Sequence, residues 1–211
     1  MKFRAAIIGV LIAFLQWPLF SQSISGLDEK AFLEIQHWRN PASEKSAEIL
    51  SGSVVPMAAA LPISLGAAAI FRHDTLLFTK ALGLAFSEGL ALGSALILKP
   101  IISRPRPYAS IENVNPIPPI PDPWSMPSGH TSTAFSTAVN LSLEFPRWQI
   151  VVPSLTWAAG AGVSRIILGQ HYPGDVIAGA ALGSASAWLG WKTRKWLNAR
   201  QSRRSVKNRK T

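Results

Sequence analysis

Six apolar segments with almost no charged side chains constrain the fold of this chain more than any other feature. Two of them exceed the roughly 20 residues that a helix needs to cross a bilayer. The last three are shorter, but charged residues or proline mark their ends. We therefore predict an all-α bundle of transmembrane helices, with buried helices of a soluble protein as the alternative. In the 211-residue sequence the segments are 5–20, 49–71, 75–98, 131–145, 148–163 and 176–191.

The net charge of +10 comes almost entirely from the C-terminal end of the chain. Residues 192–211 contain nine Lys or Arg and no acidic residue, whereas the first 191 residues carry 12 basic and 11 acidic side chains. Only about 12% of that body is charged, against roughly 25% in ordinary soluble domains. This composition favours lipid as part of the solvent. The chain has no Cys, which excludes disulfide and thiolate chemistry.

The N-terminal stretch MKFRAAIIGVLIAFLQWPLFSQS, residues 1–23, has a basic start, an apolar centre and small residues near its end. It fits either a signal peptide or a first transmembrane helix. The bundle would have six helices, or five after signal cleavage. In both cases residues 24–191 form one domain, and residues 192–211 form a basic tail.

Alternating the segments across a membrane assigns each connection to a side. With the N-terminus inside, residues 72–74, 144–147 and the basic tail also lie inside, as the excess of Lys and Arg on cytoplasmic loops requires. Residues 100–129 and 164–175 then lie outside. The polar sequences KPIISRPRP (99–107), PSGH (127–130) and SRIILGQHYPGD (164–175) all reach this outer face.

These polar sequences contain the elements of a phosphate site. Lys99, Arg106 and Arg165 are cations on a nearly neutral body, and arginine offers phosphate oxygens a planar pair of donors. Ser128 and Gly129 add backbone N–H groups at the start of a helix, where the helix dipole also favours an anion.

Two histidines supply the reactive groups. His171 lies four residues before Asp175, so the carboxylate can accept a hydrogen bond from one ring nitrogen and leave the other as a nucleophile. His130 is suited to protonate a departing oxygen. The predicted chemistry is phosphoryl transfer through a phosphohistidine, in which the cations neutralise the phosphate charge without a metal or another cofactor.

The three sequences together resemble the signature of the type 2 phosphatidic acid phosphatase (PAP2) superfamily, KxxxxxxRP, PSGH and SRxxxxxHxxxD. The parts stand complete and in order between residues 99 and 175. The resemblance implies the helical bundle that this superfamily shares with haloperoxidases, and it leaves the roles of Arg104 and Ser164 open. It implies that His171 is the nucleophile, Asp175 its orienting partner and His130 the general acid, and that the phosphate is held by Lys99, Arg106 and Arg165 with Ser128 and Gly129.

Membrane-bound members of this family act without a metal on phosphatidic acid, phosphatidylglycerol phosphate, undecaprenyl diphosphate or lipid A. The resemblance therefore implies that residues 24–191 form a lipid phosphatase of a bacterial-type inner membrane, with its active site facing the periplasm or exterior. One alternative is a soluble periplasmic acid phosphatase for small phosphomonoesters. Another is a non-catalytic membrane protein that binds lipid phosphates. We expect no nucleic-acid partner, since the basic tail is suited to anionic lipid.

Two features remain open at this point. Glu88 lies in the middle of an apolar segment, where an acidic side chain is either functional or paired within the bundle. The proline-rich stretch at residues 116–123, PIPPIPDP, is extended and semi-rigid. It fits a plain linker as well as a lid over the site.

Overall fold

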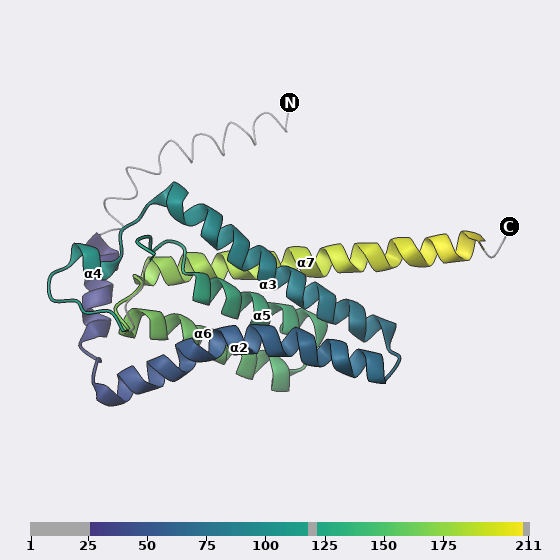
Figure 1. The fold of residues 1–211 in the computed structure, drawn as a ribbon, viewed down its shortest axis with the longest axis horizontal. Helices are drawn as coiled ribbons and strands as arrows, with labels where there is room; N and C mark the ends of the chain where they lie inside the picture. Colours follow the sequence, from purple (N-terminus) through teal and green to yellow (C-terminus); the bar gives the residue numbers. More distant parts are fainter. Residues whose placement is uncertain (1–25, 118–121, 209–211) are drawn as a thin grey trace, which may run out of the picture.

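The computed structural model describes residues 26–117 and 122–208, with side chains described to residue 200. The expected segment at residues 5–20, and with it the choice between signal peptide and first helix, lies outside the described residues. The chain forms an all-α bundle, as predicted, and a short helix over residues 26–36 lies across one end of it (Figure 1). The bundle helices are α2 (Pro41–Phe71), α3 (Thr75–Ile102), α5 (Gly129–Glu144), α6 (Trp148–Ile167) and α7 (Pro173–Asn208), with a single-turn α4 (Pro107–Ser110) between α3 and α5.

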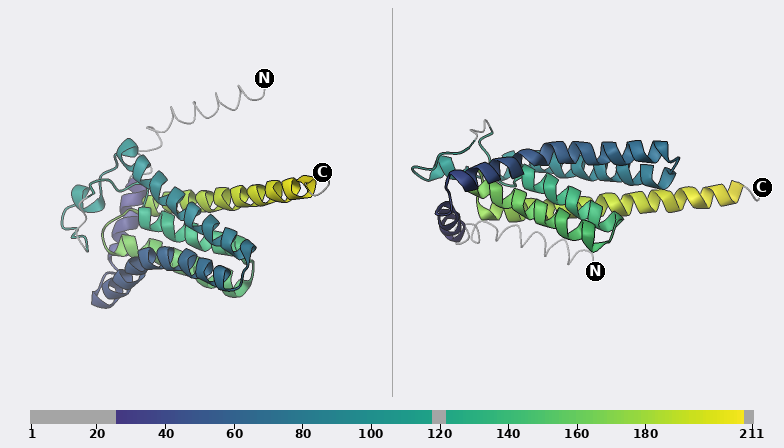
Figure 2. Two further views of the ribbon diagram at one scale, coloured as in Figure 1. Left: turned by 45° about the vertical axis from the view of Figure 1, so that its right-hand side comes forward. Right: turned by 90° about the horizontal axis from the view of Figure 1, so that it is seen from below.

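Helix α5 lies at the centre and contacts the other four long helices (Figure 2). Nearly all of its buried residues are small or carry a hydroxyl group, which lets neighbouring backbones approach closely. Two buried side-chain hydrogen bonds join it to the middle of α3. The Thr137 hydroxyl donates to Glu88 Oε1 at 2.6 Å, and Asn140 Nδ2 donates to Ser87 Oγ at 2.9 Å. Glu88 is therefore paired inside the bundle.

The outer faces of the bundle are apolar. Large side chains such as Ile63, Phe86 and Ile97 are more than half exposed. By length and composition, α2, α3 and α6 can each cross a membrane, and only 11% of the most apolar window of α2 is buried within the protein. A surface of this kind is solvated by lipid, so the chain is a membrane protein.

Local sequence sets the ends of the helices. Asn40 caps α2 by accepting from the N–H groups of Ala42 and Ser43, and the Ser43 hydroxyl accepts from the Asn40 N–H in return. Asp74 caps α3 by accepting from Leu77 N at 2.9 Å. These polar caps satisfy backbone donors that the first turn of a helix leaves free.

The expected segments match the helices, with differences at their ends. Helix α2 begins at Pro41 rather than near residue 49, because a capping box extends it through a polar stretch. Helix α6 continues to Ile167 rather than residue 163. Helix α7 does not end at residue 191 but continues into the basic tail as far as Asn208.

Candidate active site

The three polar sequences meet at one end of the bundle, next to the helix over residues 26–36 (Figure 1). Lys99 lies in the last turn of α3, and Arg106 lies just after that helix. His130 lies in the first turn of α5, and Arg165 in the last turn of α6. His171 lies two residues before α7, and Asp175 lies in the first turn of that helix. Because successive helices run in opposite directions, the order of the helices brings these residues to one end of the bundle.

The ring of His171 is held between an arginine and a carboxylate. Arg106 Nη1 lies 3.2 Å from His171 Nε2, and His171 Nδ1 lies 3.5 Å from Asp175 Oδ2. Because arginine only donates hydrogen bonds, Nε2 is the acceptor and the ring proton lies on Nδ1, toward the carboxylate. The lone pair of Nε2 therefore faces the cations. The side chain is 2% exposed.

Burial is the main cause that lowers the pKa of His171, to about 4, and the nearby charges of Arg165 and Arg106 lower it further. The carboxylate of Asp175 opposes this shift but does not outweigh it. The imidazole is therefore neutral near pH 7. A neutral ring is the form that has a free electron pair for nucleophilic attack.

Asp122 occupies the space between two of the predicted phosphate-binding cations. Its Oδ2 forms a very short contact with Lys99 Nζ and lies 3.3 Å from Arg106 Nη2, while its Oδ1 accepts from Trp124 N at 3.0 Å. Burial raises the pKa of Asp122, but the hydrogen bonds and charges of these partners lower it more. The carboxylate is therefore ionised near pH 7 and neutralises both cations. Sequence reasoning did not identify Asp122, although it is one of only two acidic residues between Lys99 and His130.

Arg165 completes the group of cations and is itself only partly paired. Its Nη1 donates to the Ser51 hydroxyl of α2 at 2.5 Å, and its buried Nε has no hydrogen-bond partner among the described residues. Burial lowers the pKa of His130 to about 3, and the nearby charges of Arg165, His171, Lys99 and Arg106 lower it further. The ring of His130 is therefore neutral near pH 7 in the free site. The predicted acid and the predicted nucleophile thus share one set of charges.

Ser128 and Gly129 form the start of α5. The Ser128 hydroxyl caps this helix by accepting from the Thr131 hydroxyl at 2.9 Å and the Thr131 N–H at 3.4 Å. The Ser128 N–H donates to the backbone oxygen of Asp175 at 3.1 Å. This N–H is therefore already used in joining α5 to α7, which differs from its expected role as a phosphate donor. The first turn of α5, from Gly129, still points its N-terminus at the site.

Arg104, whose role the sequence left open, supports Asp175. Its guanidinium lies 2.8 Å from Asp175 Oδ1 and 2.7 Å from Asp28 Oδ2, and it covers the ring of Tyr172 at 4.1 Å. Asp28, from the helix over residues 26–36, also accepts from Gly174 N at 2.7 Å. No spacing rule links residue 28 to residue 175, so sequence reasoning missed this support.

The remaining predicted residue, Ser164, is buried and donates its hydroxyl to the Ala161 carbonyl within α6 at 2.7 Å. It shapes the helix that carries Arg165. Among the described residues, no group of three or more His, Cys, Asp or Glu side chains could hold a metal ion.

Several curated relatives of this chain are named as phosphatases of lipid A or of undecaprenyl diphosphate. It is 32% identical over 114 residues to a lipid A 4'-phosphatase of Bacteroides thetaiotaomicron, covering 49% of this chain and 48% of the relative. It is 32% identical over 106 residues to an undecaprenyl-diphosphatase of Sulfolobus acidocaldarius, covering half of each chain. The chain thus spans about half the length of the curated relatives that it matches.

Solved structures share the fold. A transmembrane PAP2 type phosphatidylglycerolphosphate phosphatase from Bacillus subtilis superposes with a TM-score of 0.72 at 20% identity, covering 88% of this chain and 93% of that one. Aquifex aeolicus LpxE superposes with a TM-score of 0.65 at 27% identity, covering 77% and 93%. Residues 80–199, more than half of the chain and all three motifs, match the PAP2 superfamily. The chain belongs to the PAP2 superfamily.

Proposed function

We propose that this protein is a membrane-bound phosphatase that hydrolyses lipid phosphates or diphosphates through a phosphohistidine intermediate. The observation that carries the proposal is the position of His171, whose Nε2 faces Arg106 while its Nδ1 faces Asp175. The relatives named lipid A phosphatase and undecaprenyl-diphosphatase support a lipid substrate. The apolar outer faces of α2, α3 and α6 support access from the membrane.

In the first step, His171 Nε2 attacks the phosphorus of the terminal phosphate. A nitrogen–phosphorus bond forms as the bond between phosphorus and the lipid oxygen breaks. The negative charge of the bound phosphate raises the pKa of His130, so this histidine is protonated when substrate is present. His130 gives that proton to the departing oxygen, which leaves as a lipid alcohol or, from a diphosphate, as a lipid monophosphate. Asp175 stabilises the positive charge that develops on the His171 ring.

In the second step, water attacks the phosphohistidine. His130, now neutral, accepts a proton from the water, and the nitrogen–phosphorus bond breaks to release inorganic phosphate. His171 returns to its neutral form. Because this chemistry rests on positioning and charge neutralisation, the three cations supply the electrostatic stabilisation in both steps.

The proposed phosphate site consists of the cations Lys99, Arg106 and Arg165, together with the N-terminal turn of α5. Two of these cations, Lys99 and Arg106, both contact the Asp122 carboxylate. An incoming phosphate would displace this carboxylate, because a phosphate offers more oxygens and more negative charge to the same donors. Arg104 acts through Asp175 as a positioning residue.

The same proposal includes an orientation. The end of the bundle that carries His171 faces the periplasm or exterior, and the end that carries the basic part of α7 faces the cytoplasm of a bacterial-type cell. Residues 24–191 form the phosphatase domain, and residues 192–211 form the cytoplasmic tail.

Phosphate release from a panel of substrates tests the activity. The panel is phosphatidic acid, phosphatidylglycerol phosphate, undecaprenyl diphosphate, lipid A and a small aryl phosphate, each given to the full chain in detergent. We expect turnover of at least one lipid, loss of that turnover in His171→Asn and retention in His37→Asn, an exposed histidine whose ring lies beside Glu34. Turnover of the aryl phosphate alone would favour a small-molecule phosphatase, and binding without turnover would favour a lipid-binding protein.

A chelator and vanadate test the metal-free mechanism on the same preparation. The rate should be unchanged by EDTA and reduced by vanadate, which mimics the phosphoryl transition state. Loss of activity on chelation, with recovery on adding a divalent cation, would contradict metal independence.

A further inference from the structure

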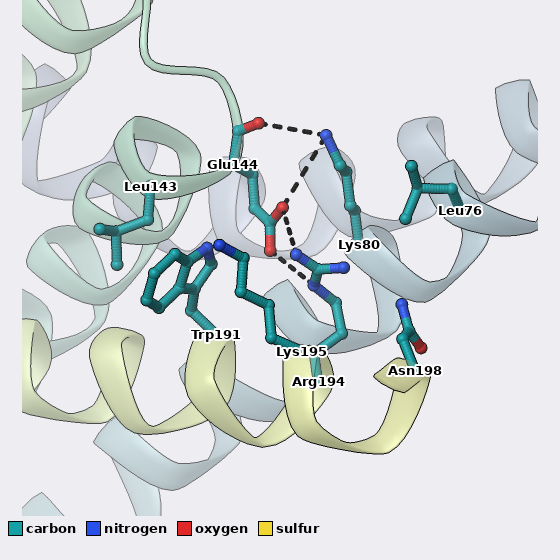
Figure 3. A pocket seen from close by; sticks show the side chains of 8 residues that line it. All are labelled: Leu76, Lys80, Leu143, Glu144, Trp191, Arg194, Lys195 and Asn198. Carbon is teal, nitrogen blue, oxygen red and sulfur yellow. Dashed lines mark hydrogen bonds and ion pairs between the residues drawn. The ribbon is translucent and has the colours of Figure 1, made fainter. Parts of the chain in front are cut away.

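A cavity of about 400 Å³ lies at the end of the bundle opposite to the candidate active site, and Figure 3 shows the side chains that line it. It opens between the start of α3, the end of α5 and the middle of α7. Cationic and apolar side chains line it together, which is the combination that a charged headgroup and its chains would contact. The lining residues are Leu76, Lys80, Leu143, Glu144, Trp191, Arg194, Lys195 and Asn198.

The charges in this cavity do not balance. Glu144 accepts from Arg194 Nε at 2.6 Å and from Arg194 Nη2 at 2.8 Å, so one carboxylate is fully engaged by one arginine. Lys80 Nζ donates to the Glu144 carbonyl at 3.1 Å and lies 3.8 Å from its carboxylate. Lys195 adds a third cation. Three cations facing one anion leave an excess positive charge, which an anion bound at this cavity would neutralise.

Trp191 adds a second, independent sign of a missing acceptor. Lys195 Nζ lies over its ring at 4.0 Å, and the indole Nε1 is buried without a hydrogen-bond partner among the described residues. Buried N–H groups normally have a partner, so this donor is expected to meet an acceptor that the protein itself does not supply. A phosphate oxygen beside Lys195 would provide it.

The cavity also lies at headgroup depth. Lys80 and Lys99 are both on α3, 19 residues apart, which corresponds to about 28 Å of helix. That length is close to the roughly 30 Å hydrocarbon core of a bilayer. With the catalytic end at one membrane surface, Lys80 is at the other.

We propose that this cavity binds the phosphate of an anionic phospholipid in the leaflet opposite to the candidate active site. The inference is independent of the catalytic proposal, because it uses neither the site residues nor turnover. It gives the basic segment of α7 a defined ligand site rather than a diffuse attraction to the membrane. Inorganic phosphate shares the headgroup chemistry but lacks the chains that would contact Leu143.

Native mass spectrometry of the delipidated full chain in detergent tests the proposal. The probes are phosphatidylglycerol, zwitterionic phosphatidylcholine of the same chains, and inorganic phosphate. Lys195→Ala is the test variant, and Lys192→Ala is the matched control, since Lys192 also lies over a tryptophan of α7, Trp188, but outside the cavity. We expect the first phosphatidylglycerol to bind more tightly than phosphatidylcholine or phosphate.

Lys195→Ala should weaken that first binding step about fivefold, and Lys192→Ala should leave it unchanged. Trp191→Phe, which keeps a ring and removes the N–H donor, should also weaken it. Equal binding of the two lipids, or equal effects of the two lysine variants, would overturn the proposal. Inorganic phosphate binding as tightly as phosphatidylglycerol would show a site for a free anion instead of a lipid.

Discussion

At the scale of single residues, the candidate site holds an acidic side chain of its own between two of the proposed phosphate-binding cations. Asp122 contacts both Lys99 and Arg106, so these cations are neutralised and held in place before substrate arrives. The side chain is 36% exposed, whereas that of Lys99 is 8% exposed. The carboxylate can therefore leave toward solvent while the cations remain.

Replacing Asp122 by Asn should make phosphate binding tighter. The amide keeps the shape of the carboxylate but lacks the charge that competes with phosphate for Lys99 and Arg106. The inhibition constant for vanadate should therefore fall about tenfold, which is the effect of losing one charge-assisted hydrogen bond. Glu112→Gln, on the same loop and exposed, is the matched control. Weaker vanadate inhibition in Asp122→Asn would mean that Asp122 builds the site rather than competes for it.

The pKa of His171 leads to a second prediction at this scale. A histidine with a pKa of about 4 is almost entirely neutral at pH 6, whereas one with the ordinary value near 6.5 would be only about a quarter neutral. The lowered pKa therefore keeps the nucleophile active in mild acid. Nitrogen NMR of histidine-labelled protein, assigned with His171→Asn, should show His171 titrating well below pH 6. Titration between pH 6 and 7 would contradict the buried, charge-coupled geometry.

At the scale of elements, close packing of α5 against α7 joins the two halves of the site. A Cβ atom on Gly183 of α7 would collide with the backbone oxygen of Ser132 in α5 and lie 2.9 Å from Ser136 N. Helix α5 carries His130, and α7 carries Asp175 in its first turn. The distance between these two helices therefore sets the distance between the acid and the nucleophile's partner.

Gly183→Ala should force α5 and α7 apart and cost about 1–3 kcal/mol of unfolding free energy, the range for overpacked cores. Gly89→Ala on α3 is the control, because a Cβ there meets no atom within 4 Å, and alanine in an exposed helix position stabilises by about 0.5–1 kcal/mol. Reversible unfolding in mixed micelles measures both changes. Equal stability of the two variants would show that α5 and α7 are not tightly packed.

At the scale of the whole molecule, the chain has two polar ends separated by an apolar middle. The proposed orientation places Glu112 outside and Gln149 inside the cell. Because the chain contains no Cys, a single cysteine at either exposed position reports its side without background. Glu112→Cys in intact spheroplasts should react with an impermeant maleimide, and Gln149→Cys should react only after permeabilisation. The reverse pattern would invert the proposed orientation.

Much of this architecture could be predicted because apolar segments and motif spacing are local properties of the sequence. The order of the helices is enough to bring Lys99, His130 and His171 to one end. Ser51 and Asp28 could not be predicted, because their contacts with Arg165 and Arg104 join positions more than 70 residues apart. Asp122 was missed because an acid in a proline-rich stretch has no spacing signal. The C-terminal extent of α7 was missed because its charge pattern suggested a tail.

The central claim is that the phosphoryl group passes through His171. Mixing the full chain with a lipid phosphate labelled on its terminal phosphorus, and stopping the reaction within one turnover in alkaline detergent, traps a phosphohistidine, because this bond survives alkali. The account predicts label on His171 Nε2 by peptide mass spectrometry, none in His171→Asn and unchanged labelling in His37→Asn. Label on another residue, or steady phosphate release by His171→Asn, would contradict it.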